Sequence, residues 1–289
     1  MRHLISFLIL ATPALAEVPV VVTDIPPVQA LVAQVMGDLG QPELLLAKGA
    51  DEHDFQLRPS QARAVAGAGL VVWIGPELTP WLDNALSTRP EGAASLALLA
   101  AEGTLRRDYA HPDADHGPTD PHVWLDPENA EVWLGLIAAE LARLDPEHAA
   151  TYTANAAAAA EGLEALDAEV AAVLAQVKGR PLISQHDAYG YLAARYGLDF
   201  VGSVALGDAA SPGASRLLEL RQVIEAQADI CLFPEAQHDP AMILELAEGT
   251  GARIGGALDP VGSTLDVGPG LYAALMRDLA ATIADCAGR

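Results

Sequence analysis

Short apolar runs alternate with longer amphipathic segments in both halves of the chain. The segment 28–36 has helical spacing of its apolar residues and ends at Gly37, and similar segments separate the later runs. The short runs lie at 18–23, 43–47 and 70–75 in the first half, and at 182–184, 199–206, 229–233 and 253–258 in the second. Strands that alternate with helices are typical of βαβ units. The pattern predicts an α/β protein of two lobes, each with a mainly parallel sheet flanked by helices.

A long helical segment interrupts this alternation in the middle of the chain. Asp145 is a good N-cap and Pro146 fits the first helical position, while Gly179 and Pro181 are typical of a helix end. The isolated Gly162 is the strongest interruption between them. We therefore expect one rigid helix of about 33 residues, about 50 Å long, running along both lobes.

The first 16 residues have the three parts of a signal peptide. A cation, Arg2, precedes the apolar run 4–11, and Ala14-Leu15-Ala16 fits a cleavage site. This predicts a periplasmic protein, secreted by a cleavable signal peptide. The expected organisation is a signal peptide at 1–16, an N-terminal α/β lobe at 17–144, a linking backbone helix at 145–179 and a C-terminal α/β lobe at 180–289.

The composition restricts the partners and the redox setting. The 289 residues carry a net charge of −23, which disfavours nucleic acid and attracts cations, although it also serves solubility alone. In an exported chain the two cysteines, Cys231 and Cys286, predict a disulfide that closes a loop of about 55 residues. Two buried free thiols are the alternative.

Three histidines and an aspartate are the candidate metal ligands. His53, His122 and His186 each lie beside an acidic residue, and Asp259 follows at a similar interval. Imidazole and carboxylate donors from separate loops suit Zn²⁺, which accepts four ligands in a tetrahedron. The loops at the carboxyl ends of strands, two from each lobe, would then meet in the cleft between the lobes.

Further acidic and histidine residues are candidates for supporting roles. A ligating imidazole usually donates its second ring N–H to a carboxylate or a carbonyl, and Glu52, Asp187 and Glu235 are available for this role. A Gly-, Pro- and Asp-rich loop precedes His122 and is a candidate for accessory metal capture, with a solvated acidic loop as the alternative. Its candidate ligands are His111, Asp113, Asp115 and His116.

Four sequence stretches together carry a family resemblance. They are DEHDFQLRPS at 51–60, DPHVWLDP at 120–127, SQHDAYGYLAARYGL at 184–198 and FPE at 233–235. They resemble the zinc and manganese solute-binding proteins of ABC importers, known as cluster A-I, over essentially the whole mature chain. The resemblance implies two α/β lobes joined by a rigid helix, with the metal ligands at His53, His122, His186 and Asp259.

The third ligand position separates zinc from manganese within this family. Manganese-type members carry a glutamate there, whereas His186 gives this chain three imidazoles and one carboxylate, which suits zinc. The resemblance therefore implies a monomeric periplasmic protein, not an enzyme, that captures Zn(II) with high affinity and delivers it to a membrane ABC permease for import. A periplasmic zinc donor is a further candidate partner.

Three alternatives remain open at this point. The first is a zinc-dependent hydrolase with an open coordination position and Glu52 or Glu235 as general base. The second is a manganese-specific binding protein of the same fold. The third is a surface adhesin or metal-buffering protein that would differ only in its partners.

Overall fold

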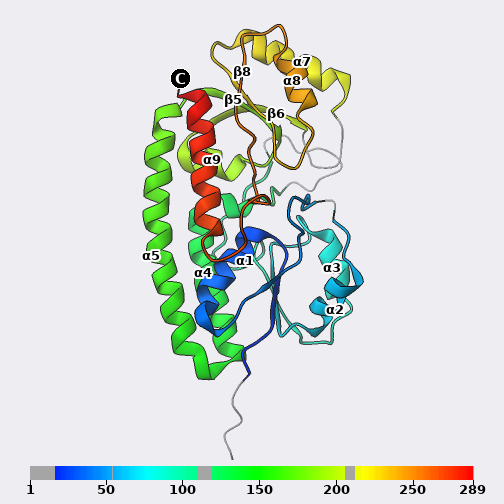
Figure 1. Cartoon of the computed structure of the whole chain (residues 1–289), viewed down its shortest axis with the longest axis vertical. Coiled ribbons are helices and arrows are strands. Elements are labelled where there is room, and N and C mark those ends of the chain that lie inside the picture. The colour runs from blue at the N-terminus through cyan, green and yellow to red at the C-terminus, as the bar shows by residue number, and fades with distance from the viewer. Residues whose placement is uncertain (1–16, 54, 110–118, 206–211, 289) are drawn as a thin grey trace, which may run out of the picture.

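The protein is an elongated two-lobed molecule with one long helix along its side (Figure 1). The computed structural model describes residues 17–53, 55–109, 119–205 and 212–288. The predicted signal peptide at 1–16 lies outside these residues. Within them, no helix combines the length and the apolar character needed to cross a membrane.

The first lobe is built on a parallel four-stranded sheet in the order β2-β1-β3-β4. All four residues of β3 are buried, as expected for an inner strand of a parallel sheet covered on both faces. The strands are β1 (Val21–Thr23), β2 (Glu43–Leu44), β3 (Leu70–Trp73) and β4 (Ala94–Ala97), and the helices are α1 (Pro26–Met36), α2 (Pro59–Gly67), α3 (Pro80–Leu86) and α4 (Pro127–Leu144).

The second lobe repeats this plan with a parallel sheet in the order β6-β5-β7-β8. Its central strand β5 is buried along its whole length and ends at His186. The strands are β5 (Pro181–His186), β6 (Asp199–Ala205), β7 (Cys231–Phe233) and β8 (Arg253–Ile254), and the helices are α6 (Gly190–Tyr196), α7 (Ala214–Ala226), α8 (Ala241–Ala247) and α9 (Leu271–Ala287). The prediction of two lobes with parallel sheets is confirmed.

The connecting helix is helical from residue 146 to residue 177 in three parts. The α-helix α5 (Ala149–Leu174) lies between the 3₁₀ turns η3 (Pro146–His148) and η4 (Ala175–Val177). Its 26 residues correspond to about 39 Å, so the regular helix is shorter than expected. Gly162 does not interrupt it.

The start of this helix differs from the prediction. Asp145 makes no side-chain cap hydrogen bond. Instead its carboxylate accepts hydrogen bonds from His148 Nδ1 at 2.7 Å and Tyr152 Oη at 2.8 Å. The Asp145 carboxylate therefore binds the side chains of His148 and Tyr152 in the first turns of the helix, in place of the expected N-cap hydrogen bond.

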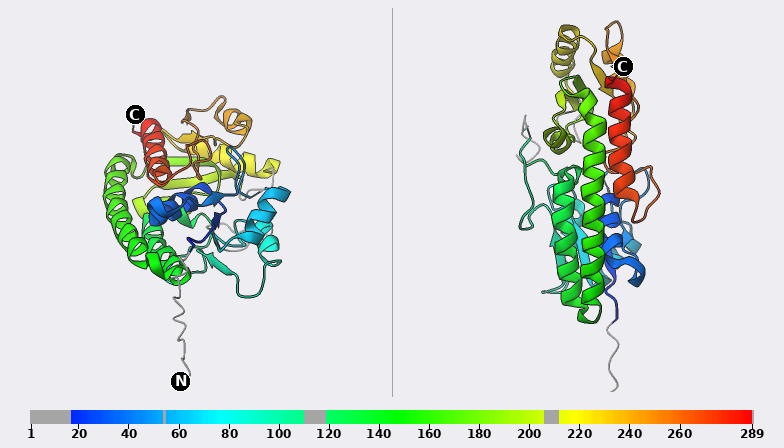
Figure 2. Two further views of the ribbon diagram at one scale, coloured as in Figure 1. Left: turned by 60° about the horizontal axis from the view of Figure 1, so that its bottom comes forward. Right: turned by 90° about the vertical axis from the view of Figure 1, so that its left-hand side faces the viewer.

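The long helix α5 packs against helices of both lobes. It contacts α1 and α4 from the first lobe and α9 from the second. The right-hand view of Figure 2 shows α5 running beside α4 and α9. Its apolar face, including Leu163, Leu166 and Val170, joins the largest buried cluster, which also takes residues from both lobes. Bending α5 would disturb this shared core, so the helix restricts movement between the lobes to small tilts.

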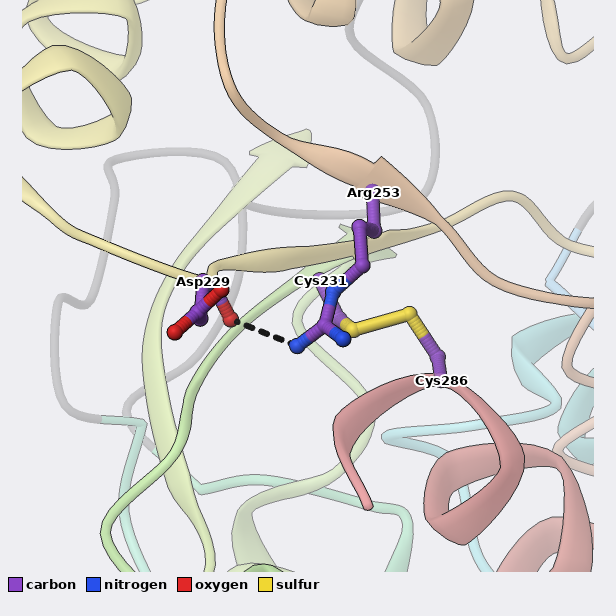
Figure 3. Close-up of a disulfide and its surroundings, with 4 residues drawn as sticks. All are labelled: Asp229, Cys231, Arg253 and Cys286. Atoms are coloured by element: carbon purple, nitrogen blue, oxygen red, sulfur yellow. Dashed lines mark hydrogen bonds between the residues drawn. A yellow bond between two sulfur atoms is a disulfide. The ribbon is translucent and has the colours of Figure 1, made fainter. Parts of the chain in front are cut away.

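A disulfide fastens the end of α9 to the sheet of the second lobe. Figure 3 shows Cys231, at the start of β7, bonded to Cys286, near the end of α9. Next to it, the guanidinium of Arg253 donates a hydrogen bond to the carbonyl of Asp229 at 3.3 Å. The predicted disulfide is confirmed, and the alternative of two free thiols is wrong.

Removing this disulfide should destabilise the second lobe. The bond closes a loop with a sequence separation of 55 residues. In the chain-entropy model such a loop corresponds to about 4 kcal/mol of stability. We expect the Cys231→Ser/Cys286→Ser double variant to lose stability on this scale in urea unfolding of the zinc-free protein. An unchanged midpoint would show that the cross-link contributes nothing to folding.

Candidate metal centre

His122 is fully buried in the first lobe, where a carboxylate fixes its ring. It directly precedes the 3₁₀ turn η2 (Val123–Leu125). Asp120 Oδ1 accepts hydrogen bonds from the His122 main-chain N–H at 2.9 Å and from Nδ1 at 2.8 Å. This places the proton on Nδ1 and leaves the lone pair of Nε2 available for a cation.

His186 has the same arrangement in the second lobe. It is the last residue of β5, and its Nδ1 lies 2.5 Å from Glu235 Oε2. The other oxygen of Glu235 accepts a hydrogen bond from Tyr189 Oη at 2.8 Å. Glu235 therefore holds the ring of His186 as Asp120 holds that of His122, and its supporting role stays a prediction.

The two rings face each other across the boundary between the lobes. His122 Nε2 and His186 Nε2 are 3.3 Å apart. Two lone pairs at this distance repel each other unless a cation or a proton lies between them. A tetrahedral zinc ion with Zn–N bonds of about 2.05 Å places two ligand nitrogens about 3.3 Å apart. The observed separation therefore fits one edge of a zinc tetrahedron.

His53 and Glu52 complete this donor group. One donor atom from each of Glu52, His53, His122 and His186 lies within 4.8 Å of all the others. His53 lies on a short loop, where its main-chain N–H donates to Asp51 Oδ1 at 2.8 Å and Trp81 Nε1 donates to the Glu52 carbonyl at 3.0 Å. The loop thus presents a carboxylate and an imidazole as consecutive residues.

The Glu52 carboxyl is buried beside two of these imidazoles. Its residue is 2% exposed, and Oε1 lies 3.9 Å from His53 Nε2. Burial raises the pKa of Glu52 to about 7, although the neighbouring His53 and His186 act to lower it. A divalent cation would compensate for the burial of the ionised carboxylate, so this residue is better placed to be a ligand than its predicted supporting role suggests.

Asp259 differs most from its predicted place. It belongs to neither of the donor groups formed by the described residues. Its Oδ1 accepts from the main-chain N–H of Ser263, and its Oδ2 accepts from the main-chain N–H and the hydroxyl of Thr264. The carboxylate therefore closes its own turn, beside a cavity of about 260 Å³ that Leu265 also lines.

The remaining candidates lie apart from the centre or outside the described residues. Asp187 lines a neighbouring cavity of about 360 Å³ and joins neither donor group. The proposed capture residues His111, Asp113, Asp115 and His116 lie outside the described part of the chain. His238, which was not among the predicted residues, forms a second donor group with His186 and Glu235. Its position three residues after Glu235 was the available signal.

A glycine allows the two lobes to approach at the centre. A Cβ on Gly190, at the start of α6, would lie 2.8 Å from Asp120 Oδ2. Next to it, Tyr191 Oη donates to the Asp120 carbonyl at 3.1 Å and accepts from the Arg107 main-chain N–H at 2.8 Å. The Gly-Tyr pair of the second lobe thus holds the loop that orients His122 in the first.

The comparisons with known proteins cover nearly the whole chain. A high-affinity zinc uptake system protein, ZnuA, from Paracoccus denitrificans (strain Pd 1222) is 47% identical over 96% of this chain and 94% of its own. A crystal structure of ZnuA has a TM-score of 0.78 at 26% identity, covering 93% of this chain and 99% of that one. The manganese complex of FpvC from Pseudomonas aeruginosa has a TM-score of 0.81 at 22% identity, covering 92% and 97%, and shows the shared fold alone.

Fold and site together define a class of protein. Two parallel-sheet lobes joined by one long helix, with a buried imidazole cluster between them, define a metal-binding solute-binding protein of the cluster A-I type. The family model described as ZnuA, zinc-uptake complex component A, periplasmic, matches residues 21–286. The chain belongs to this family.

The raised pKa of Glu52 predicts how the stability of the zinc-free protein depends on pH. Because the folded pKa of Glu52, about 7, lies above its ordinary value of 4.5, the contribution of Glu52 to stability is fully present below pH 4.5 and is lost as the pH rises through 7. The cost at pH 8 is about 3 kcal/mol, which Glu52→Gln should remove. Urea unfolding of both proteins at pH 4 and pH 8 measures this difference.

A second buried carboxyl makes the comparison with the variant essential. Burial also raises the pKa of Asp24 to about 7, so the wild-type protein alone cannot separate the two groups. Asp24 is present in both proteins and cancels in the difference between them. Equal losses of stability from pH 4 to pH 8 in the two proteins would contradict the assignment to Glu52.

Proposed function

We propose that this protein captures Zn(II) in the periplasm and delivers it to a membrane ABC permease for import. The observation that carries the proposal is the pair of Nε2 atoms, 3.3 Å apart, whose rings are held by carboxylates on their Nδ1 side. Membership of the zinc-uptake family supports the same function. The signal-like segment 1–16 supports export.

Three imidazoles are proposed as ligands of one zinc ion. His53 and His122 come from the first lobe and His186 from the second, so a bound ion joins the lobes directly. Imidazole favours Zn²⁺ over Mn²⁺, because carboxylate, carbonyl and water oxygens suit manganese better. The donor set therefore favours zinc over the manganese alternative, which the fold alone does not separate.

Glu52 is our preferred fourth ligand, in place of Asp259. Its carboxylate already belongs to the donor group of the three imidazoles. Asp259 would first have to give up the hydrogen bonds from Ser263 and Thr264. Coordination by Asp259 is the second possibility, and it requires this turn to open.

A transport role is favoured over the zinc-hydrolase alternative. Catalytic zinc keeps one open position for water, whereas four protein ligands give a closed site. The chain belongs to a family of periplasmic components of zinc-uptake complexes. With Glu52 as a ligand, the sequence's first candidate for a general base would no longer be available for that role.

Removing an imidazole should weaken zinc binding by orders of magnitude. We expect His122→Ala and His186→Ala each to bind zinc at least 100-fold more weakly than the wild type in competition with a chelator of known affinity. His148→Ala is the matched control. His148 is also a half-buried histidine paired with a carboxylate, that of Asp145, but neither residue belongs to the donor groups formed by the described residues. Wild-type affinity in either ligand variant would refute the proposed ligand set.

The fourth ligand can be identified by comparing two isosteric variants. Glu52→Gln should reduce zinc affinity more than Asp259→Asn, because the Glu52 carboxylate lies within the donor group and the Asp259 carboxylate does not. The same chelator competition measures both, and circular dichroism checks that each variant is folded. A larger loss in Asp259→Asn would restore Asp259 as the ligand and would mean that its turn opens on metal binding.

A further inference from the structure

A second group of metal-binding side chains lies beside the buried centre. One donor atom from each of His186, Glu235 and His238 lies within 4.8 Å of the other two. His238 Nε2 is 3.7 Å from Glu235 Oε2, and the ring centroids of His186 and His238 are 5.9 Å apart. Two imidazoles and a carboxylate are a donor set that suits zinc.

This second group is more accessible to solvent than the centre. The side chain of His238 is 28% exposed, whereas those of Glu235 and His186 are 0% and 5% exposed. The group therefore consists of one partly exposed side chain, His238, and two buried side chains. The most exposed ligand of the centre, His53, has a side chain that is 14% exposed, so a cation from solvent reaches His238 more readily than it reaches the ligands of the centre.

His186 belongs to both donor groups and connects them. Its Nε2 faces His122 in the centre, while its Nδ1 faces Glu235. When zinc occupies the centre, Nδ1 keeps its proton and its hydrogen bond to Glu235. The second position then has only Glu235 and His238 as full ligands, so it must bind more weakly than the centre.

The turn that carries Glu235 and His238 also contains a buried oxygen without a hydrogen-bond donor. Within the described residues, the side-chain oxygen of Gln237, between Glu235 and His238, is buried without a hydrogen-bond donor. Its amide nitrogen donates to Asp259 Oδ1 at 3.3 Å. A buried acceptor without a donor is unfavourable, and a cation with its bound water close to this turn would relieve it.

We propose that His238 and Glu235, next to the shared His186, form a second and weaker zinc position at the rim of the buried centre, where the ion binds on its way in or out. The proposal rests on the zinc function proposed above, because His186 is shared between the two positions. It gives His238 a role in zinc exchange without making it a ligand of the final site.

The test is a zinc titration of the full protein followed by NMR of the histidine side chains. ¹H–¹⁵N spectra report each imidazole, and single substitutions assign the signals. We expect a first tight equivalent that shifts the signals of His53, His122 and His186, then a weaker equivalent that shifts the signal of His238. Calorimetry on the same samples gives the two affinities.

Two histidine variants make the test specific to the second position. His238→Ala should weaken the second event at least tenfold while the first equivalent stays within twofold. His148→Ala is a closely matched control, because His148 is also 28% exposed and also faces a carboxylate three residues earlier. It should retain both events.

The outcomes separate this proposal from the main one. A second event that leaves the His238 signal unchanged, or that persists in His238→Ala, overturns the rim position. Its loss in His148→Ala does the same, because the effect would then be nonspecific. Failure of the first tight equivalent in the wild-type protein would instead refute the proposed zinc centre.

Discussion

The centre depends on a buried clamp that fixes the two lobes against each other. The indole Nε1 of Trp124, two residues after His122, donates to the Pro260 carbonyl of the second lobe at 2.8 Å, and Tyr272 Oη at the start of α9 donates to the Trp124 carbonyl at 2.8 Å. Both aromatic side chains are fully buried. Breaking either bond would leave a buried polar group unsatisfied, at a cost of about 1–3 kcal/mol. The clamp therefore sets the position of His122 relative to His186.

Other contacts fix the proposed zinc ligands relative to this clamp. The shared core under α5 resists bending, and the Gly49 N–H donates to the Ser263 carbonyl at 3.1 Å, which ties the His53 loop to the second lobe. Carboxylates then set the orientation of the individual rings. We infer that zinc binding at such a preformed site requires little reorganisation and that capture and release depend on local changes in the loops.

Much of this arrangement could be predicted from the sequence, because its signals are local. The alternation of strands and helices and the three histidines beside acidic residues are both short-range patterns. No bounds were predicted for helices α2 and α3, although Pro59 and Pro80 at their first positions were usable signals. The choice between Glu52 and Asp259 depends on which carboxylate the tertiary structure brings to the imidazoles, and no local pattern contains that information. His238 was also missed: its spacing from Glu235 is a local signal, but its second partner, His186, lies at the end of β5, far away in the sequence.

The central claim is that the centre is preformed between lobes that the long helix and the clamp hold in place. Hydrogen exchange of the zinc-free and the zinc-loaded protein, with solution scattering on the same samples, tests it most directly. The account predicts that zinc increases protection around residues 51–53 and 119–122, while α5 and α9 exchange at the same rates and the radius of gyration is unchanged. Faster exchange along residues 149–174 in the zinc-free protein, or a clear change in its dimensions, would contradict a preformed centre.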